Sequence, residues 1–200
     1  MKYSLELEKD VASSVPRVTL SINSGKWISE DIDIYKLIYE EYQRLKEDNR
    51  SNNGTIVNTF ASIRPAIKSL HMRGYFDGDS TLCRNTKLAM KVYNNNSTEE
   101  KRNAVDREMQ IFRKAIIIAE GGKTYDSEIF LHESCIYMDV LKELLDKGYY
   151  VWQCYDAFYA TNPYNQTNEG FEKMVSEIIE IKANNYINKY CNNQRIKSVA

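Results

Sequence analysis

The stretch Tyr149-Tyr150-Val151-Trp152-Gln153-Cys154-Tyr155-Asp156-Ala157-Phe158-Tyr159-Ala160 decides the fold. Aromatic and β-branched side chains fill its first half, which predicts a strand over Tyr149–Cys154. Ala157–Ala160 predicts the strand that returns, with Tyr155 and Asp156 between the two as a tight turn. The stretch is therefore a β-hairpin that carries an acidic residue at its tip.

The other end of the chain predicts one more strand. Tyr3, Leu5 and Leu7 alternate with polar residues within Lys2–Val11, and this run reaches Asp10. Such alternation is typical of a half-buried strand. Because strands lie at both ends of the chain and helical patterns lie between them, the fold class predicted is α+β, with a small antiparallel sheet built from both ends.

Helical spacing fills the remainder of the chain. In the first helix, Ser13–Ile22, Ser13 or Ser14 is the expected N-cap and Pro16 fits the first turn. Further helices are expected over residues 31–45, 62–73, 81–93, 98–119, 128–145 and 168–190. We therefore expect a single domain in which residues 1–60 and 125–200 carry the sheet and residues 61–124 form a helical insertion.

The composition is that of an ordinary globular protein, with 42% hydrophobic and 28% charged residues. No apolar run reaches the roughly 18–20 residues that cross a bilayer, and the first residues lack the apolar run of a signal peptide. Four separated cysteines and two histidines indicate reduced thiols rather than a zinc site. Abundant Asn and Tyr with scarce Pro and Gly hint at an AT-rich source. We expect a cytoplasmic protein of a bacterium or phage-infected host cell, with no membrane partner.

Charge is unevenly distributed along the chain. Residues 64–114 contain 11 Lys and Arg against 6 Asp and Glu, although the whole chain has a net charge of −1. A basic segment of this kind is typical of a surface that faces phosphates, and equally of a solvated helical surface.

Three local patterns follow one another along the chain. The first is Asp10, at the end of a strand, with Arg17 seven residues later. The second is Arg64, Lys68, Met72 and Phe76, whose spacing of four places them along one helical face. The third is the hairpin with Gln153, Tyr155 and Asp156. Their order carries more information than any one of them.

These patterns resemble motifs A, B and C of family A DNA polymerases and single-subunit phage RNA polymerases. Asp10 and Arg17 match motif A, while Tyr155 and Asp156 stand where motif C has His-Asp. The residues of the second pattern match motif B, with Phe76 in place of Tyr. The resemblance implies a palm-like sheet, a fingers-like insertion and a template-directed nucleotidyltransferase.

The chemistry of phosphoryl transfer agrees with these residue types. Such enzymes position the phosphates and neutralise charge, often with two metal ions roughly 3.5–4 Å apart. The resemblance implies that Asp10 and Asp156 bind Mg²⁺ or Mn²⁺ as the catalytic carboxylates. The residues expected to bind substrate are Arg17, Arg64, Lys68, Met72, Phe76 and His132, the last in a helix near the nascent base pair.

The sequence also departs from the family pattern. Asp77 replaces a motif B Gly, and Ala157 replaces the Glu that follows the motif C Asp in the DNA enzymes. Val15 stands where the DNA enzymes place a Glu that excludes ribose, so the choice between DNA and RNA stays open. Because motif A begins at residue 10, we expect template, primer and nucleoside triphosphates as partners, together with a further subunit that grips the duplex.

Other interpretations of the same residues stay open. A strand-end Asp is often a turn or cap residue, an Arg and a Lys four apart are often surface charge, and His132 also fits a cap or a hydrogen-bonded core histidine. The alternatives are a non-catalytic helical nucleic-acid-binding or phage assembly protein, in which Asp10 and Asp156 lie far apart, and an inactive polymerase-like subunit.

Overall fold

The computed structural model describes residues 6–48, 64–65, 67–68, 71, 110–121 and 128–199. These residues belong to two compact units: unit 1 comprises Met1–Ile32 and Glu128–Ala200, and unit 2 comprises Asp33–Ser127. Unit 2 therefore begins at Asp33, whereas the sequence predicts that residues 33–60 belong with the sheet.

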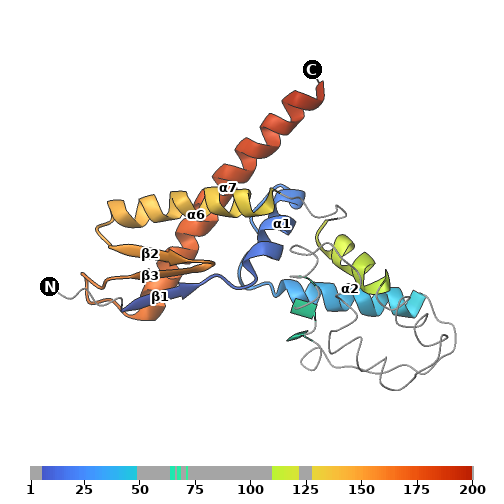
Figure 1. Cartoon of the computed structure of the whole chain (residues 1–200), viewed down its shortest axis with the longest axis horizontal. Helices are drawn as coiled ribbons and strands as arrows, with labels where there is room; N and C mark the ends of the chain where they lie inside the picture. Colours follow the sequence, from blue (N-terminus) through green and yellow to red (C-terminus); the bar gives the residue numbers. More distant parts are fainter. Residues whose placement is uncertain are drawn as a thin grey trace. The chain divides into compact units, whose positions relative to one another are not determined.

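Unit 1 is built on a three-stranded antiparallel sheet in the order β1-β3-β2 (Figure 1). Its strands are β1 (Leu7–Asp10), β2 (Val151–Cys154) and β3 (Ala157–Ala160). Both ends of the chain supply strands, and the fold is a mixture of helices with a small antiparallel sheet, as the sequence predicted. Residues 2–5 of the first predicted strand lie outside the described residues.

The register of the sheet assigns each side chain to one of its two faces. Lys9 and Gln153 both pair with Phe158, whereas Asp10 pairs with Ala157. Since successive side chains of a strand point to opposite faces, Lys9, Gln153 and Phe158 share one face and Asp10 lies on the other. Phe158 is fully buried. We call the face that carries Phe158 the inner face and the other the outer face.

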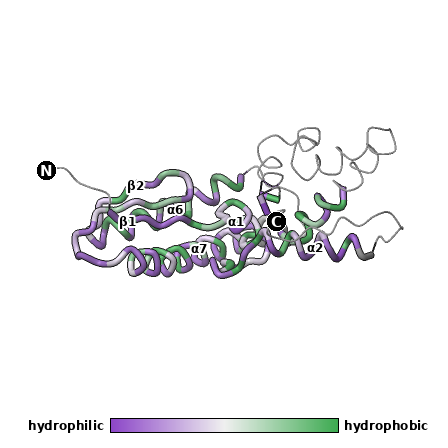
Figure 2. The backbone as a smooth tube through the Cα atoms, turned by 90° about the horizontal axis from the view of Figure 1, so that it is seen from below, coloured by the Kyte–Doolittle hydropathy of each residue, from purple (hydrophilic) through white to green (hydrophobic). Residues whose placement is uncertain are grey.

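Three helices complete unit 1: α1 (Ser14–Ser24), α6 (Ile129–Asp146) and α7 (Asn168–Val199). Tyr137 of α6 packs edge-to-face on Phe158 of the inner face, with ring centroids 5.1 Å apart. Hydrophobic and hydrophilic residues alternate along α6 and α7, as in helices that bury one side (Figure 2). An ion pair of 3.1 Å between Lys182 and Glu143 joins α7 to α6.

A glycine closes α6 and turns the chain towards β2. Gly148 has a φ of 87°, and its amide donates a hydrogen bond of 2.9 Å to the carbonyl of Leu145. A Cβ atom at this position would lie 2.7 Å from the hydroxyl oxygen of Tyr164. The backbone angle therefore favours glycine, and a Cβ atom would also force the Tyr164 side chain to move.

Unit 2 contains α2 (Ile34–Asp48) and a helical segment over residues 110–119. Asp33 accepts a hydrogen bond of 3.0 Å from the amide of Tyr35, which is the geometry of an N-cap. Tyr42 packs on Phe112, with ring centroids 5.3 Å apart. The helix predicted over residues 81–93 and the first part of the one over 98–119 lie outside the described residues.

Candidate functional site

Asp10 and Asp156 lie on neighbouring segments at one end of the sheet. Asp10 is the last residue of β1 and pairs with Ala157, the residue that follows Asp156. The amide of Val11 donates a hydrogen bond of 2.9 Å to the carbonyl of Asp156, which joins the two segments directly. Asp10 is exposed and Asp156 is partly exposed. The two acidic residues, far apart in the sequence, are therefore neighbours along the backbone of unit 1.

Left-handed backbone conformations occur beside both acidic residues. Tyr155, immediately before Asp156, and Ser13, three residues after Asp10, each have a φ of 55°. For a bulky residue such as Tyr this conformation is unfavourable, and it persists only where the surroundings hold it. Gln153 holds the hairpin turn, because its amide nitrogen donates a hydrogen bond of 2.8 Å to the carbonyl of Tyr155.

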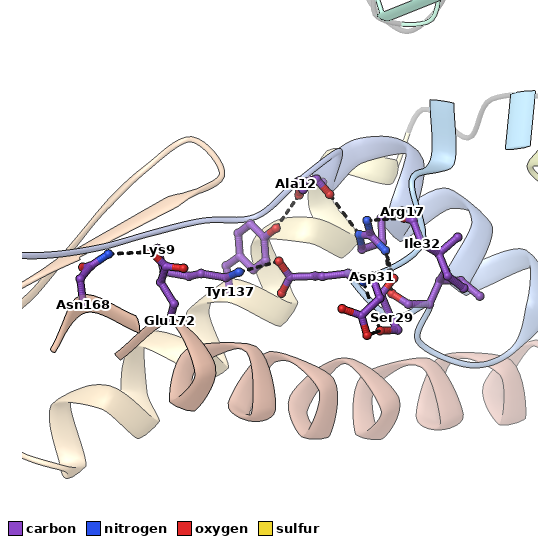
Figure 3. Close-up of polar contacts among 12 residues, drawn as sticks. Lys9, Ala12, Arg17, Ser29, Asp31, Ile32, Tyr137, Asn168 and Glu172 are labelled. Atoms are coloured by element: carbon purple, nitrogen blue, oxygen red, sulfur yellow. Dashed lines mark hydrogen bonds and ion pairs between the residues drawn. The ribbon is translucent and has the colours of Figure 1, made fainter. Parts of the chain in front are cut away.

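Arg17 anchors the loop behind the end of β1. Its side chain is fully buried, and its guanidinium donates hydrogen bonds to the carbonyls of Ala12 (3.0 Å), Ser29 and Ile32 (2.9 Å) (Figure 3). It also donates to the carbonyl of Ile28 (3.0 Å). In this arrangement the guanidinium has no exposed surface with which to meet a substrate. Its physical role is to hold residues 28–32 against the start of α1.

A polar network that no local sequence pattern predicts lies beside these residues. The hydroxyl of Ser14, at the start of α1, donates a hydrogen bond to Glu133 of α6. The hydroxyl of Tyr137 lies 2.5 Å from the Ser14 oxygen and donates to it, since the single Ser14 proton is already used. Ser14 is thus engaged with α6, and Ser13, one of the two predicted residues, occupies the N-cap position of α1 without a side-chain capping hydrogen bond.

The negative charge of Asp156 acts on two groups of this network, Glu133 and Tyr137. Burial raises the pKa of Glu133, and the negative charge of Asp156 raises it further, although the Ser14 hydrogen bond opposes them. Burial also raises the pKa of Tyr137, with a further contribution from the charge of Glu133. Glu133 stands in the apolar stripe of α6, four residues before Tyr137. A charged residue in such a stripe is the one sequence signal that singles it out.

The raised pKa of Glu133 makes stability depend on pH. The pKa of Glu133 is higher in the folded state than its ordinary value of 4.5, which applies to the unfolded chain. Ionisation of this carboxyl therefore destabilises the fold, and the loss of stability begins as the pH rises above 4.5. We expect Glu133→Gln to raise the free energy of unfolding at pH 8, because the amide keeps an acceptor for Ser14 without the charge. The advantage should disappear as the pH falls below 4.5, and urea titrations at both pH values measure it. An advantage that grows in acid would contradict the assignment.

His132 lies in the core between α6 and α7. It is buried, and its Nδ1 atom lies 2.7 Å from the hydroxyl of Tyr186. Its ring packs edge-to-face on Tyr190, with centroids 4.5 Å apart. Of the two readings of this histidine, these contacts favour the hydrogen-bonded core residue over a residue that faces a base pair.

Arg64 and Lys68, the described residues of the second pattern, belong to unit 2. Arg64 donates a hydrogen bond of 3.1 Å to Asp33, and its guanidinium lies 5.2 Å from the centre of the Tyr35 ring. Lys68 is exposed. Met72 and Phe76 lie outside the described residues, so their predicted roles stay predictions.

Two of the residues at the sheet end are of a type that binds metal ions. Asp10 and Asp156 supply carboxylate oxygens, which Mg²⁺ prefers together with water and phosphate oxygens. Among residues 6–48, 110–121, 128–199 and the few described between them, no group of three or more His, Cys, Asp or Glu is arranged to hold a metal ion. A cation at this position would therefore depend on two protein carboxylates and on ligands from substrate and water.

Comparisons with family models, curated proteins and solved structures find no match to this chain. Among the described residues, no helix combines the length and the apolar character needed to span a membrane.

Proposed function

We propose that this chain is the palm-like catalytic core of a template-directed nucleotidyltransferase, a minimal or split DNA or RNA polymerase. The observation that carries the proposal is the backbone adjacency of Asp10 and Asp156, joined by the hydrogen bond of 2.9 Å from Val11 to Asp156. Asp10 pairs directly with Ala157, so Asp10 and Asp156 lie diagonally across the pair of segments, and we propose that their carboxylates serve one metal centre.

Each residue at the sheet end has a distinct task in this proposal. Asp10 and Asp156 bind divalent cations, Mg²⁺ or Mn²⁺, which when bound activate the attacking hydroxyl and stabilise the leaving phosphate oxygens. Gln153 fixes the turn from which Asp156 projects. The Ser14, Glu133 and Tyr137 network holds α1 against α6, so that the segment after Asp10 keeps its place.

Further residues and partners complete the proposal. Arg64 and Lys68 bind the triphosphate of the incoming nucleotide, Arg64 through two parallel hydrogen bonds and Lys68 as a point charge. Met72 and Phe76 contact its base. The template, the primer and a further subunit that grips the duplex are the partners, in the cytoplasm of a bacterium or of a phage-infected cell.

Nucleotide incorporation on a primed template is the experiment that tests the proposal. We expect the purified chain to extend a labelled primer with Mg²⁺ or Mn²⁺, and to stop when the metal is chelated. Asp10→Asn and Asp156→Asn should each lower the rate by roughly 100-fold or more, because an amide does not replace the charge of a metal-binding carboxylate.

Asp139→Asn is the matched control. Asp139 lies on α6 of the same unit, in an exposed ion pair of 3.0 Å with Lys142, and such pairs contribute little to stability. Its activity should equal that of the parent chain. Incorporation that survives either change at the sheet end would remove the mechanism. Metal-independent, salt-sensitive nucleic-acid binding without incorporation would favour the non-catalytic alternative, and absence of metal binding would favour an inactive subunit.

A further inference from the structure

The sheet of unit 1 has two edges, and the edge at β1 is protected. The amide of Glu8, which points away from the sheet, donates a hydrogen bond of 2.8 Å to the side-chain oxygen of Asn168. β1 also carries three charged residues in a row, Glu8, Lys9 and Asp10. Covered backbone groups and charged side chains are two ways in which proteins keep an edge strand from pairing with another chain.

The opposite edge, at β2, has neither protection. The amide of Thr161 donates a hydrogen bond of 3.0 Å to the carbonyl of Tyr150, and this fixes the alternation of hydrogen bonds along β2. The backbone groups of Tyr150 and Trp152 therefore point to β3, whereas those of Val151 and Gln153 point away from the sheet. Among the strands that the structure describes, none pairs with this side of β2. β2 contains no charged residue.

Aromatic side chains beside this edge face solvent. Trp152 is 64% exposed, although tryptophan is usually well buried, and Tyr150 is 65% exposed. Both lie on the outer face, since Trp152 pairs with Tyr159, the residue after Phe158. An open, uncharged edge strand with exposed aromatic residues is a template for pairing with another chain.

We propose that β2 pairs with β2 of a second copy of this chain, antiparallel about a two-fold axis at Trp152, so that the two sheets become one continuous sheet. Such a contact is self-complementary, because each copy contributes the same residues. β2 suits it because a strand without charged residues brings no like charges together. The pairing goes beyond the proposed function and does not involve Asp10, which lies on the strand at the opposite edge.

The backbone around β2 selects one register for this pairing. Val151 of each copy pairs with Gln153 of the other, and each such pair exchanges two hydrogen bonds, so the outward groups of both residues are satisfied. A shift by two residues in one direction would need Tyr149, whose amide already donates a hydrogen bond of 3.1 Å to Leu144. A shift in the other direction would need Tyr155, whose φ of 55° is not that of a strand.

This register places Trp152 directly beside Trp152 of the second copy on the outer face. The two form a non-hydrogen-bonded pair, in which Cα atoms are about 4.5 Å apart and side chains are closest. Aromatic pairs across two strands stabilise a sheet. Tyr150 lies opposite Cys154 of the second copy in the same manner. The pairing therefore explains why the aromatic side chains of this edge are exposed in the single chain.

Exposed apolar residues of α6 share the centre of this pairing. α6 lies beside β2 and runs along it in the opposite direction (Figure 1). Leu131, Met138 and Leu145, seven residues apart, are 58%, 51% and 54% exposed. Met138 lies about 15 Å of helix before Gly148, and Trp152 lies about 14 Å of strand after it. The axis at Trp152 is therefore level with Met138, and it brings Leu131 of one copy level with Leu145 of the other.

Sedimentation equilibrium of the full chain measures the association, which should depend on protein concentration. Trp152→Lys and Trp152→Glu should each weaken it about 10-fold or more, because like charges then oppose each other and the aromatic pair is lost. An equimolar mixture of the two variants should associate more strongly than either alone, because opposite charges then meet at the axis. Ile181→Lys makes the same change at an exposed residue of α7 and should associate as the parent does.

Disulfide formation tests the register. Under mild oxidation Tyr150→Cys should give a covalent dimer through Cys154 of the second copy, seen on a non-reducing gel, and adding Cys154→Ser should abolish it. The two Cys154 residues lie about 14 Å apart in this register, so the parent chain should not cross-link through them. This test does not depend on the charged variants, so it decides the matter if either of them does not fold.

Several results would overturn the pairing. One is a parent chain that stays monomeric at every concentration. Another is a Trp152→Lys chain that associates as the parent does, or two charged variants that are folded by circular dichroism yet do not associate when mixed. A monomeric parent chain that instead binds a basic peptide or single-stranded DNA through Trp152, followed by tryptophan fluorescence, would assign the edge to a different partner.

Discussion

Replacing Arg17 by Met is expected to lower the free energy of unfolding by about 3–5 kcal/mol. The side chain is fully buried, and its guanidinium satisfies the carbonyls of Ala12, Ile28, Ser29 and Ile32. Each hydrogen bond from a charged donor is worth about 1.5–3 kcal/mol, and buried carbonyls left without a donor cost more. Methionine fills similar space and donates nothing. Urea unfolding followed by tryptophan fluorescence measures the loss, because both tryptophans lie in unit 1.

Two further variants show whether the hydrogen bonds of Arg17 or its positive charge stabilise the fold. Lys173→Met removes an exposed cation from α7 and should change stability by less than about 0.5 kcal/mol. Arg17→Lys keeps the charge but loses the planar fork, so its stability should fall between parent and Arg17→Met. Unchanged stability of Arg17→Met with a raised KM for nucleotide would instead assign Arg17 to substrate binding, as the motif resemblance first implied.

Glu120→Ala is expected to destabilise unit 2 by about 3–5 kcal/mol. Glu120 and His71 are both almost fully buried, and the Nε2 atom of His71 is hydrogen-bonded to a carboxylate oxygen of Glu120. Removing one partner of a buried pair leaves a desolvated polar group, and this is costly even where the pair itself adds little. Unit 2 contains no tryptophan, so far-UV circular dichroism follows its unfolding.

The controls for this pair separate burial from charge. Glu40→Ala on α2 removes an exposed carboxylate that lies 3.9 Å from Lys36, and it should be nearly neutral. The double change His71→Leu with Glu120→Met replaces both partners by apolar groups and should recover most of the loss. A double variant as unstable as Glu120→Ala would show that the hydrogen-bonded pair itself stabilises the unit.

The hairpin illustrates what the sequence predicted well. The strand Ala157–Ala160 was predicted with its observed bounds, because aromatic residues and a two-residue turn leave little choice. Helix ends were less well predicted. The helix expected over residues 31–45 begins at Ile34, since Asp33 caps it, and the last helix runs past Tyr190 to Val199.

The candidate site was only partly predictable. The resemblance to the polymerase motifs implies that Asp10 and Asp156 meet, and their segments are neighbours in the sheet. Their shared metal centre stays a prediction. Glu133 was not foreseen, since its contact with Ser14 depends on how α6 packs on α1, and no local pattern encodes that packing. The burial of Arg17 could not be predicted either, because its partners are backbone carbonyls of a loop and no local pattern encodes the position of that loop.

Mn²⁺ binding tests most directly whether Asp10 and Asp156 share one metal centre. Electron paramagnetic resonance of free Mn²⁺, titrated against the protein, measures the bound fraction. The account predicts that the parent chain and Asp139→Asn bind the ion, that Asp10→Asn and Asp156→Asn each lose it, and that the double variant is no weaker than either single one. Undiminished binding by both single variants would contradict it.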